Sequence, residues 1–223
     1  KTGRIKNSNT TCLIDQPLQA DLSALLKREI RMENDANCFA LSEALDGAGQ
    51  GQAIVFGMIL GTGVGGGIVV NQQLLTGLQS ITGEWGHNPL CPDGPRCYCG
   101  RRGCIETFLS GPALAADYAR RGGEPTTTAQ TIAALAKDND PLAQDVLSVF
   151  FNYFGQALAT IINILDPHVV VIGGGLSCID ALYSRGREAA APYVFNDEFA
   201  TPIVSNINGD SAGVRGAAQL WPA

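Results

Sequence analysis

The feature that most constrains this chain is a histidine followed by closely spaced cysteines in a loop rich in glycine and proline. The segment GEWGHNPLCPDGPRCYCGRRGCIE contains His87, Cys97, Cys99 and Cys104. One imidazole nitrogen and three thiolates form the closed tetrahedral ligand set that is typical of structural zinc. The sequence therefore predicts a zinc loop over residues 87–104, around which the rest of the fold must be arranged.

The cysteines of this loop also allow a second interpretation. The chain has seven cysteines, and unpaired cysteines are common in hydrophobic cores. The loop is polar, however, and Arg101 and Arg102 lie beside the cysteines, where their charge offsets that of the thiolates. Metal binding is therefore the favoured interpretation. The role of Cys91 is not decided by the sequence: it is either a further metal ligand or a residue outside the site.

Composition narrows the class of protein. A net charge of −6 and a pI near 4.8 argue against a nucleic-acid partner, because phosphate-binding surfaces are usually basic. With 223 residues, 45% of them hydrophobic and only 16% charged, the chain can bury a sizeable core. We find no apolar run of about 18 residues and no signal peptide at the start. We therefore expect a cytoplasmic protein with a small-molecule partner and no membrane contact.

Hydrophobic periodicity predicts alternating strands and helices, which is an α/β fold class. The predicted strands are residues 30–33, 53–60, 67–70 and 169–172. The predicted helices are residues 21–29 with Asp21 as a cap, a helix starting at the NDAN turn, 105–121 with a break near Gly111, 129–164 with a break at 138–141, and 213–221.

Two glycine-rich turns are linked to predicted strands. Strand, glycine turn and helix together present backbone N–H groups to a phosphate or nucleotide. Most glycine-rich turns only connect strands, so this signal is weak without further support. The turn residues are Gly61, Thr62, Gly63, Gly173, Gly174 and Gly175.

Several of these segments together resemble the motifs of the ROK family (repressors, open reading frames and kinases). They are CYCGRRGCIE, EWGH, LGTGVGGGIVVNQQLLTG, NDANCFALSEA, LDPHVVVIGGGLS and GDSAGVRGAA. The resemblance covers nearly the whole chain and implies an actin-like, hexokinase-type ATPase fold related to ribonuclease H. It implies that residues 16–205 form the large sugar- and ATP-binding lobe, that 1–15 are a remnant of the small lobe, and that 206–223 are a C-terminal helix returning toward it.

The resemblance also implies roles for individual residues. Asp35 is expected to be the general base that takes a proton from the attacking sugar hydroxyl. Asn34, Glu84, His87 and Glu106 are expected to bind the sugar, with zinc on one nitrogen of His87 and the other nitrogen facing the sugar. Without the resemblance, the residues of the NDAN turn are better read as a helix cap, and the two glutamates as surface or helix-start carboxylates.

The nucleotide motifs follow the family only in part. Residues 61–63 resemble its second phosphate loop and residues 173–175 its adenosine motif, which implies ATP with Mg²⁺ as a cofactor. The family's first phosphate motif is absent, so we expect the chain to lack its small lobe and to be inactive as it stands. Asn7 and Asn9 are weak candidates for polar residues near the sugar.

The expected function is an ATP-dependent hexose kinase that phosphorylates a 6-hydroxyl group, and family members are commonly homodimers. EWGHNPL, CYCG and VRGAAQLWP resemble fructokinases, and we expect fructose as the substrate. LGTGVGGGI and NDANCFALSEA look equally like N-acetylglucosamine kinases, and glucokinase is a further alternative. The competing class is a sugar-sensing ROK repressor, which shares the zinc loop but tends to lose the NDAN turn and the GTG loop.

Overall fold

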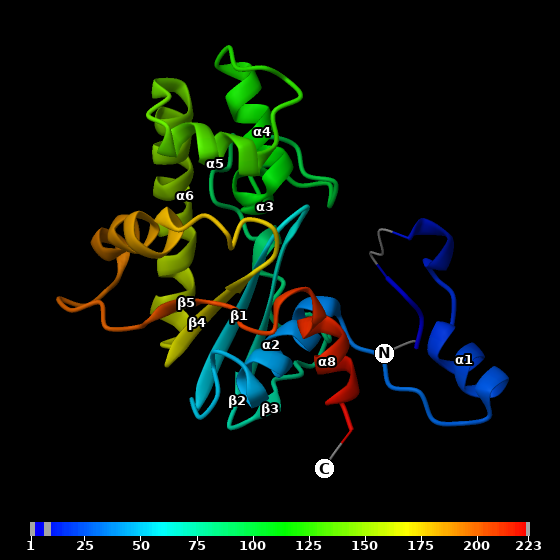
Figure 1. The fold of residues 1–223 in the computed structure, drawn as a ribbon. Coiled ribbons are helices and arrows are strands. Elements are labelled where there is room, and N and C mark those ends of the chain that lie inside the picture. Colours follow the sequence, from blue (N-terminus) through cyan, green and yellow to red (C-terminus); the bar gives the residue numbers. More distant parts are fainter. Residues whose placement is uncertain (1–2, 7–9, 222–223) are drawn as a thin grey trace.

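A mixed five-stranded sheet forms the centre of the fold (Figure 1). The computed structural model describes residues 3–6 and 10–221, so Asn7 and Asn9 lie outside the described residues. The strand order is β3-β2-β1-β4-β5, with β4 and β5 parallel to β1 and with β2 and β3 in an antiparallel arrangement. The bounds are β1 (Ile54–Leu60), β2 (Val64–Val70), β3 (Gln73–Leu74), β4 (Val169–Gly173) and β5 (Ile203–Ser205).

Helices and short turns alternate with these strands, which confirms the predicted α/β class. The breaks predicted near Gly111 and at residues 138–141 are present, and Ser110 and Asp140 cap the helices that follow them. The helices are α1 (Leu18–Leu26), α2 (Asp35–Asp46), α3 (Glu106–Leu109), α4 (Gly111–Arg120), α5 (Ala129–Lys137), α6 (Pro141–Leu165), α7 (Arg187–Ala190) and α8 (Ala212–Ala218). Short single turns occur at η1 (Thr11–Leu13), η2 (Trp85–His87), η3 (Leu182–Gly186), η4 (Ala191–Tyr193) and η5 (Gly209–Ser211).

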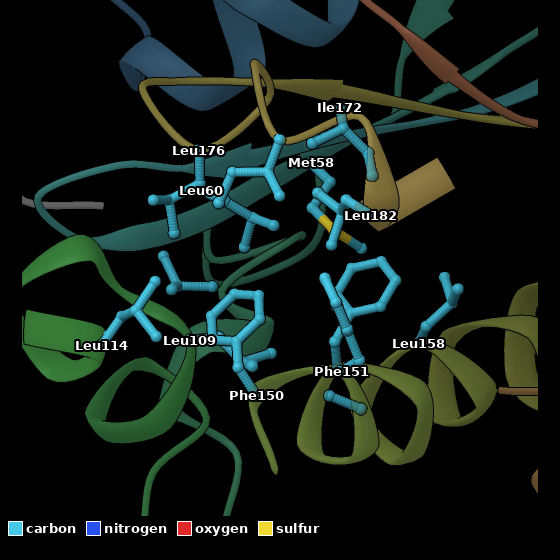
Figure 2. Close-up of a cluster of buried hydrophobic side chains, with 14 of the residues drawn as sticks. Met58, Leu60, Leu109, Leu114, Phe150, Phe151, Leu158, Ile172, Leu176 and Leu182 are labelled. Atoms are coloured by element: carbon cyan, nitrogen blue, oxygen red, sulfur yellow. The ribbon is translucent and has the colours of Figure 1, made fainter. Parts of the chain in front are cut away.

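Side chains of the central strands alternate between two hydrophobic cores, as the two-residue period of a strand requires. Met58, Leu60 and Ile172 face the core that contains α6 and the short helices around α4. Figure 2 shows these side chains opposite Phe151 and Leu158 of α6. The sheet is therefore covered on this face by α6.

The opposite face of the sheet packs against α2 and α8. Val55, Val69, Val169 and Val171 meet four side chains of α2 and Ala212 of α8. In Figure 1, α2 and α8 lie together on the side of the sheet away from α6. The result is a helix–sheet–helix sandwich in which β1 and β4 are buried on both faces.

Helix α6 is long and apolar enough to span a membrane by length and composition alone. Its 25 residues include a window with a mean hydropathy of 1.3, and half of that window is buried inside the protein. Phe150, Phe154 and Leu158 belong to its buried face and lie in the larger core. We therefore assign α6 as the core helix of the sandwich.

The second predicted strand of the glycine pair starts earlier than expected. Gly65, Gly66 and Gly67 lie inside β2, and the turn is confined to residues 61–63. The cause is the close approach of α2, because a Cβ on Gly67 would lie 2.7 Å from the Cβ of Ala40. Gly65 and Gly67 are therefore needed for packing against α2, whereas a Cβ on Gly66 would lie 2.8 Å from the Phe56 ring on the other face of the sheet.

Two predictions near the N-terminus were wrong. Residues 30–33 pair with no strand in the described part of the chain. Helix α1 runs over Leu18–Leu26, so Asp21 lies in its first turn and is not the cap. None of its residues is buried, and Leu25 is 76% exposed. The helical period was detected correctly, but within the described residues Leu25 and Leu26 of its apolar face stay exposed.

A buried carboxylate fastens α2 to the C-terminal segment. Glu43 is fully buried and accepts hydrogen bonds from the backbone N–H groups of Ala48 (2.8 Å), Ile207 (3.3 Å) and Asn208 (3.0 Å). Both carboxylate oxygens are used, because Oε2 accepts from Ala48 and Ile207 and Oε1 accepts from Asn208. Glu43 therefore holds together two segments that are far apart in the sequence.

Replacing Glu43 with glutamine should lower the free energy of unfolding by about 1–3 kcal/mol, because the buried amide nitrogen cannot accept and at least one of the three N–H groups loses its acceptor. Thermal unfolding followed by circular dichroism measures this change. Glu188→Gln is the matched control, since Glu188 is exposed and its side chain has no polar partner within the described residues. Equal melting temperatures for the two variants would contradict the assignment.

Candidate functional site

The NDAN turn begins helix α2 and has the geometry of a helix cap. Asn34 is the N-cap, and its side-chain oxygen accepts a hydrogen bond from the Ala36 N–H at 2.9 Å. One oxygen of Asp35 accepts from the same N–H at 2.9 Å, and its other oxygen has no hydrogen-bond partner among the described residues. Both side chains are exposed. The cap interpretation is thus correct, and it leaves one carboxylate oxygen of Asp35 available.

Glu33, the residue before the NDAN turn, stabilises the turn through hydrogen bonds. One of its carboxylate oxygens accepts from the Asn34 N–H at 2.9 Å and from the side-chain amide of Asn37 at 3.0 Å. Burial, followed by the charges of Glu33 and Asp35, raises the pKa of the Cys38 thiol to about 11. Cys38 is therefore a neutral core residue, and the acidic groups lie at the end of the helix.

Three segments that are distant in sequence meet at the start of β2. The Glu106 carboxylate accepts a hydrogen bond from the Val64 N–H at 2.9 Å. Gly86 packs directly on the Val64 backbone, because a Cβ on Gly86 would lie 2.0 Å from the Val64 carbonyl oxygen. Gly65 lies against α2, because a Cβ on Gly65 would lie 3.3 Å from the Cβ of Ala36. The structure therefore brings the NDAN turn, the EWGH segment and Glu106 together around two residues of one strand.

Trp85 anchors the EWGH segment. Its side chain is 3% exposed, its indole N–H donates to the Gly65 carbonyl at 2.8 Å, and its ring packs edge-on against Phe56. Glu84 precedes this anchor and is exposed, while His87 follows it and is half-buried. The buried indole thus fixes the backbone from which both predicted sugar-binding side chains extend.

The predicted metal ligands form one compact cluster. The ligand atoms of His87, Cys97, Cys99 and Cys104 all lie within 4.8 Å of one another. The Nδ1 atom of His87 is 3.5 Å from the sulfur of Cys97, and the sulfurs of Cys99 and Cys104 are 3.6 Å apart. Tetrahedral zinc, with bonds of about 2.0–2.3 Å, needs ligand separations of about 3.5–3.8 Å. The four residues therefore fit zinc, with Nδ1 as the histidine ligand.

Local backbone and charge interactions support this loop. Gly103 has φ +65°, and a Cβ there would lie 1.5 Å from the Cys91 carbonyl oxygen, so the close crossing requires glycine. A hydrogen bond from the Arg101 side chain lowers the pKa of the Cys99 thiol to about 6. Burial raises the pKa of the Cys104 thiol to about 12. Cys91 itself does not belong to the cluster formed by the described residues.

The second ring nitrogen of His87 contacts a tyrosine that sequence analysis missed. The His87 Nε2 atom lies 3.0 Å from the Tyr98 hydroxyl, and the two rings pack edge-on with centroids 5.1 Å apart. Burial, then the charge of Glu106, and with smaller effect that of Glu84, raise the pKa of the Tyr98 hydroxyl. In the sequence Tyr98 looked like a spacer between two cysteines, and no pattern signalled its contact.

A cavity of about 440 Å³ lies beside the glycine turns. Gly61, Thr62 and Gly175 line it, as the sequence predicted for nucleotide-binding residues. The other three predicted residues, Gly63, Gly173 and Gly174, do not line it. A Cβ on Gly63 would lie 2.8 Å from a Glu106 oxygen, so this residue faces the acidic group instead. The other lining residues are Gly111, Pro112, Ala115, Pro125, Thr126, Thr127, Thr128, Ala129, Gln130 and Leu176.

The two glycine turns are joined by backbone contacts. The Gly111 N–H donates to the Gly61 carbonyl at 2.8 Å, and the Leu176 N–H donates to the Leu60 carbonyl at 2.9 Å. Gly174 has φ +81°, and a Cβ there would lie 2.5 Å from the Leu60 carbonyl oxygen. Sequence reasoning missed the loop before α5 that completes the cavity. Its run of threonines over residues 126–128 was the available signal.

Comparison with known proteins identifies the family. Residues 1–223 match the model of the ROK family, and the chain belongs to this family. It is 40% identical over 228 residues to an N-acetyl-D-glucosamine kinase of Yersinia pseudotuberculosis, covering 98% of this chain and 75% of that protein.

Two solved structures show the same fold. A ROK family glucokinase from Streptomyces griseus, in complex with glucose and AMPPNP, has a TM-score of 0.84 at 30% identity, with 93% of this chain and 73% of that one covered. A ROK family transcriptional regulator, a homologue of the E. coli MLC protein, has a TM-score of 0.82 at 29% identity, with 92% and 55% covered. The hexokinase-type fold of the ROK family is thus confirmed, and two of these three relatives are sugar kinases by name. The comparisons do not specifically support fructose.

The metal assignment predicts different behaviour for two cysteines of the same loop. Cys99→Ser should lower the zinc content of the purified protein strongly, because a hydroxyl is a poor zinc ligand, whereas Cys91→Ser should retain one zinc per chain. Elemental analysis by mass spectrometry measures both. Loss of zinc in Cys91→Ser, or a full zinc content in Cys99→Ser, would show that the ligand set is different.

Proposed function

We propose that the protein is an ATP-dependent sugar kinase that phosphorylates the 6-hydroxyl group of N-acetylglucosamine. The observation that carries this proposal is the meeting of the NDAN turn, the EWGH segment and Glu106 at Val64 and Gly65. The curated relative with 40% identity is an N-acetyl-D-glucosamine kinase, which favours this sugar over the fructose expected from shorter motifs. Glucose is the alternative substrate.

Asp35 is proposed as the general base. Phosphoryl transfer depends chiefly on the positioning of the nucleophile, and a carboxylate oxygen can orient and accept the proton of a hydroxyl. The hydrogen bond from Ala36 to one oxygen of Asp35 fixes the carboxylate, while the other oxygen has no partner among the described residues. The cap geometry therefore serves catalysis, because it holds the base at the exposed end of a buried helix.

Asn34, Glu84, His87 and Glu106 are proposed to bind the sugar hydroxyls. The Glu106 carboxylate is oriented by Val64, and the side-chain amide nitrogen of Asn34 has no partner in the described part of the chain. Two carboxylates, an amide and an imidazole N–H supply both donors and acceptors, which a sugar with adjacent hydroxyls can pair. Zinc on Nδ1 of His87 would supply a fixed tautomer and a fixed ring orientation.

The cavity beside residues 61–63 is proposed to hold ATP, which enters with Mg²⁺. Its backbone N–H groups and threonine hydroxyls suit a polyphosphate and a ribose. Gly174, with φ +81°, allows the turn after β4 that precedes the cavity residue Gly175. The lobe division at residues 1–15, 16–205 and 206–223, the homodimer and the cytoplasmic location remain predictions.

A sugar-sensing transcriptional regulator is the second candidate. It is favoured by the structural similarity to a ROK family regulator at a TM-score of 0.82. The available oxygen of Asp35 and the cavity at the glycine turns favour the kinase, because sensing a sugar requires neither a base nor a nucleotide site. ATP turnover that depends on a hexose separates the two candidates.

Asp35→Asn in the intact protein should reduce kcat by at least about 10²-fold, because the amide keeps the shape of the carboxylate and loses its basicity. Sugar affinity, measured by calorimetry, should change little. Asp138→Asn is the control, since Asp138 is exposed and its side chain has no polar partner in the described chain. Unchanged turnover in Asp35→Asn would refute the assignment of the base.

A panel of hexoses with ATP and Mg²⁺ tests the choice of substrate. N-acetylglucosamine should give the highest kcat/KM, followed by glucose, and fructose should be the poorest of the three. A coupled assay for ADP release measures each value under identical conditions. A preference for fructose would contradict the proposed substrate and would leave the kinase assignment intact.

A further inference from the structure

We propose that Tyr98 competes with the sugar for the hydrogen bond donated by the Nε2–H group of His87, and that this competition lowers the sugar affinity of the site. The inference rests on the proposed function, since it takes His87 as a sugar-binding residue. Tyr98 would be a positioning residue, because it acts on the sugar only through the imidazole. The observation that supports this proposal is the 3.0 Å distance between Nε2 of His87 and the hydroxyl of Tyr98.

The geometry of the cysteine cluster decides which nitrogen of His87 carries the proton. Nδ1 lies 3.5 Å from the Cys97 sulfur, the separation expected for two ligands of one zinc ion. A neutral imidazole that binds a metal through one nitrogen has its proton on the other. The Nε2–H group therefore points toward Tyr98, and it is a single donor that can serve one good acceptor at a time.

The backbone of Tyr98 is fixed by the metal-ligand cysteines on either side of it, while its side chain is exposed. It lies between two zinc ligands, Cys97, which is 8% exposed, and Cys99, whereas Tyr98 itself is 70% exposed. Its hydroxyl has no other hydrogen-bond partner among the described residues. The side chain can therefore leave His87 by rotation alone, with water replacing the lost hydrogen bond.

The position of the hydroxyl places this competition inside the proposed sugar site. The Tyr98 hydroxyl lies 3.0 Å from Nε2 of His87, so it occupies the place beside the ring nitrogen that is proposed to face the sugar. A tyrosine hydroxyl and a sugar hydroxyl offer the same acceptor to an imidazole N–H. A sugar hydroxyl that accepts a hydrogen bond from the Nε2–H group of His87 must therefore displace the Tyr98 hydroxyl.

Removing the Tyr98 hydroxyl should tighten sugar binding. The net contribution of one hydrogen bond corresponds to roughly a two- to ten-fold change in affinity. Tyr98→Phe should therefore lower the dissociation constant and the KM for the sugar by about this factor. The effect should be similar for N-acetylglucosamine and glucose, because the competition concerns a ring hydroxyl and not the N-acetyl group. The value of kcat should stay unchanged, because the phenylalanine leaves Asp35 as it was.

The experiment compares wild type, Tyr98→Phe and Tyr193→Phe in the intact, zinc-loaded protein. Tyr193 is the control, since its hydroxyl makes a 3.3 Å surface contact with Asn152 and lies outside the proposed site. Calorimetric titration with N-acetylglucosamine and with glucose, both without nucleotide, gives the affinities. Elemental analysis confirms the zinc content of each variant.

The inference predicts tighter binding of both sugars in Tyr98→Phe, at full zinc content and unchanged kcat, and no change in Tyr193→Phe. Unchanged affinity would overturn it, and weaker binding would overturn it in favour of a direct contact between Tyr98 and the sugar. Loss of zinc in Tyr98→Phe would also overturn it, because Tyr98 would then be a structural part of the loop. If wild type binds neither sugar, the proposed function itself fails.

Discussion

The close packing of three segments on the first residues of β2 is the contact on which the rest of the site depends. Glycine at positions 63, 65 and 67 leaves room for the Glu106 carboxylate, for Ala36 and for Ala40. The N–H of Val64 then orients that carboxylate, and the carbonyl of Gly65 accepts from the indole of Trp85. A side chain at these glycines would push α2 and the acidic groups away from each other.

The cysteine cluster extends this arrangement into the loop. Cys104 lies two residues before Glu106, and His87 lies two residues after Trp85, so a metal bound by the cluster would connect the two chain segments that reach β2. The isolated bridge between Pro89 and Cys104 ties the same segments through their backbones. A metal bound here would therefore also position His87 and Glu106, the two proposed sugar-binding residues that this small loop holds.

The sequence was most informative where chemistry constrains spacing. The four metal ligands could be predicted because thiolates and an imidazole at these intervals have few other uses, and the helix breaks at Ser110 and Asp140 because capping residues precede proline. The roles of Gly65 and Gly67 could not be predicted, because these glycines make room for α2, which approaches from elsewhere in the chain. Tyr98 was missed because only the folded loop brings its hydroxyl to His87, and the run of threonines at 126–128 because only the tertiary fold places it beside the glycine turns.

The most direct test of the account is a crystal structure of the zinc-loaded protein with bound N-acetylglucosamine. The account predicts one sugar at the start of β2, with hydroxyl groups within hydrogen-bonding distance of Glu84, His87 and Glu106, and with its 6-hydroxyl group against the carboxylate of Asp35. A sugar bound elsewhere, or bound here with its 6-hydroxyl group turned away from Asp35, would contradict it.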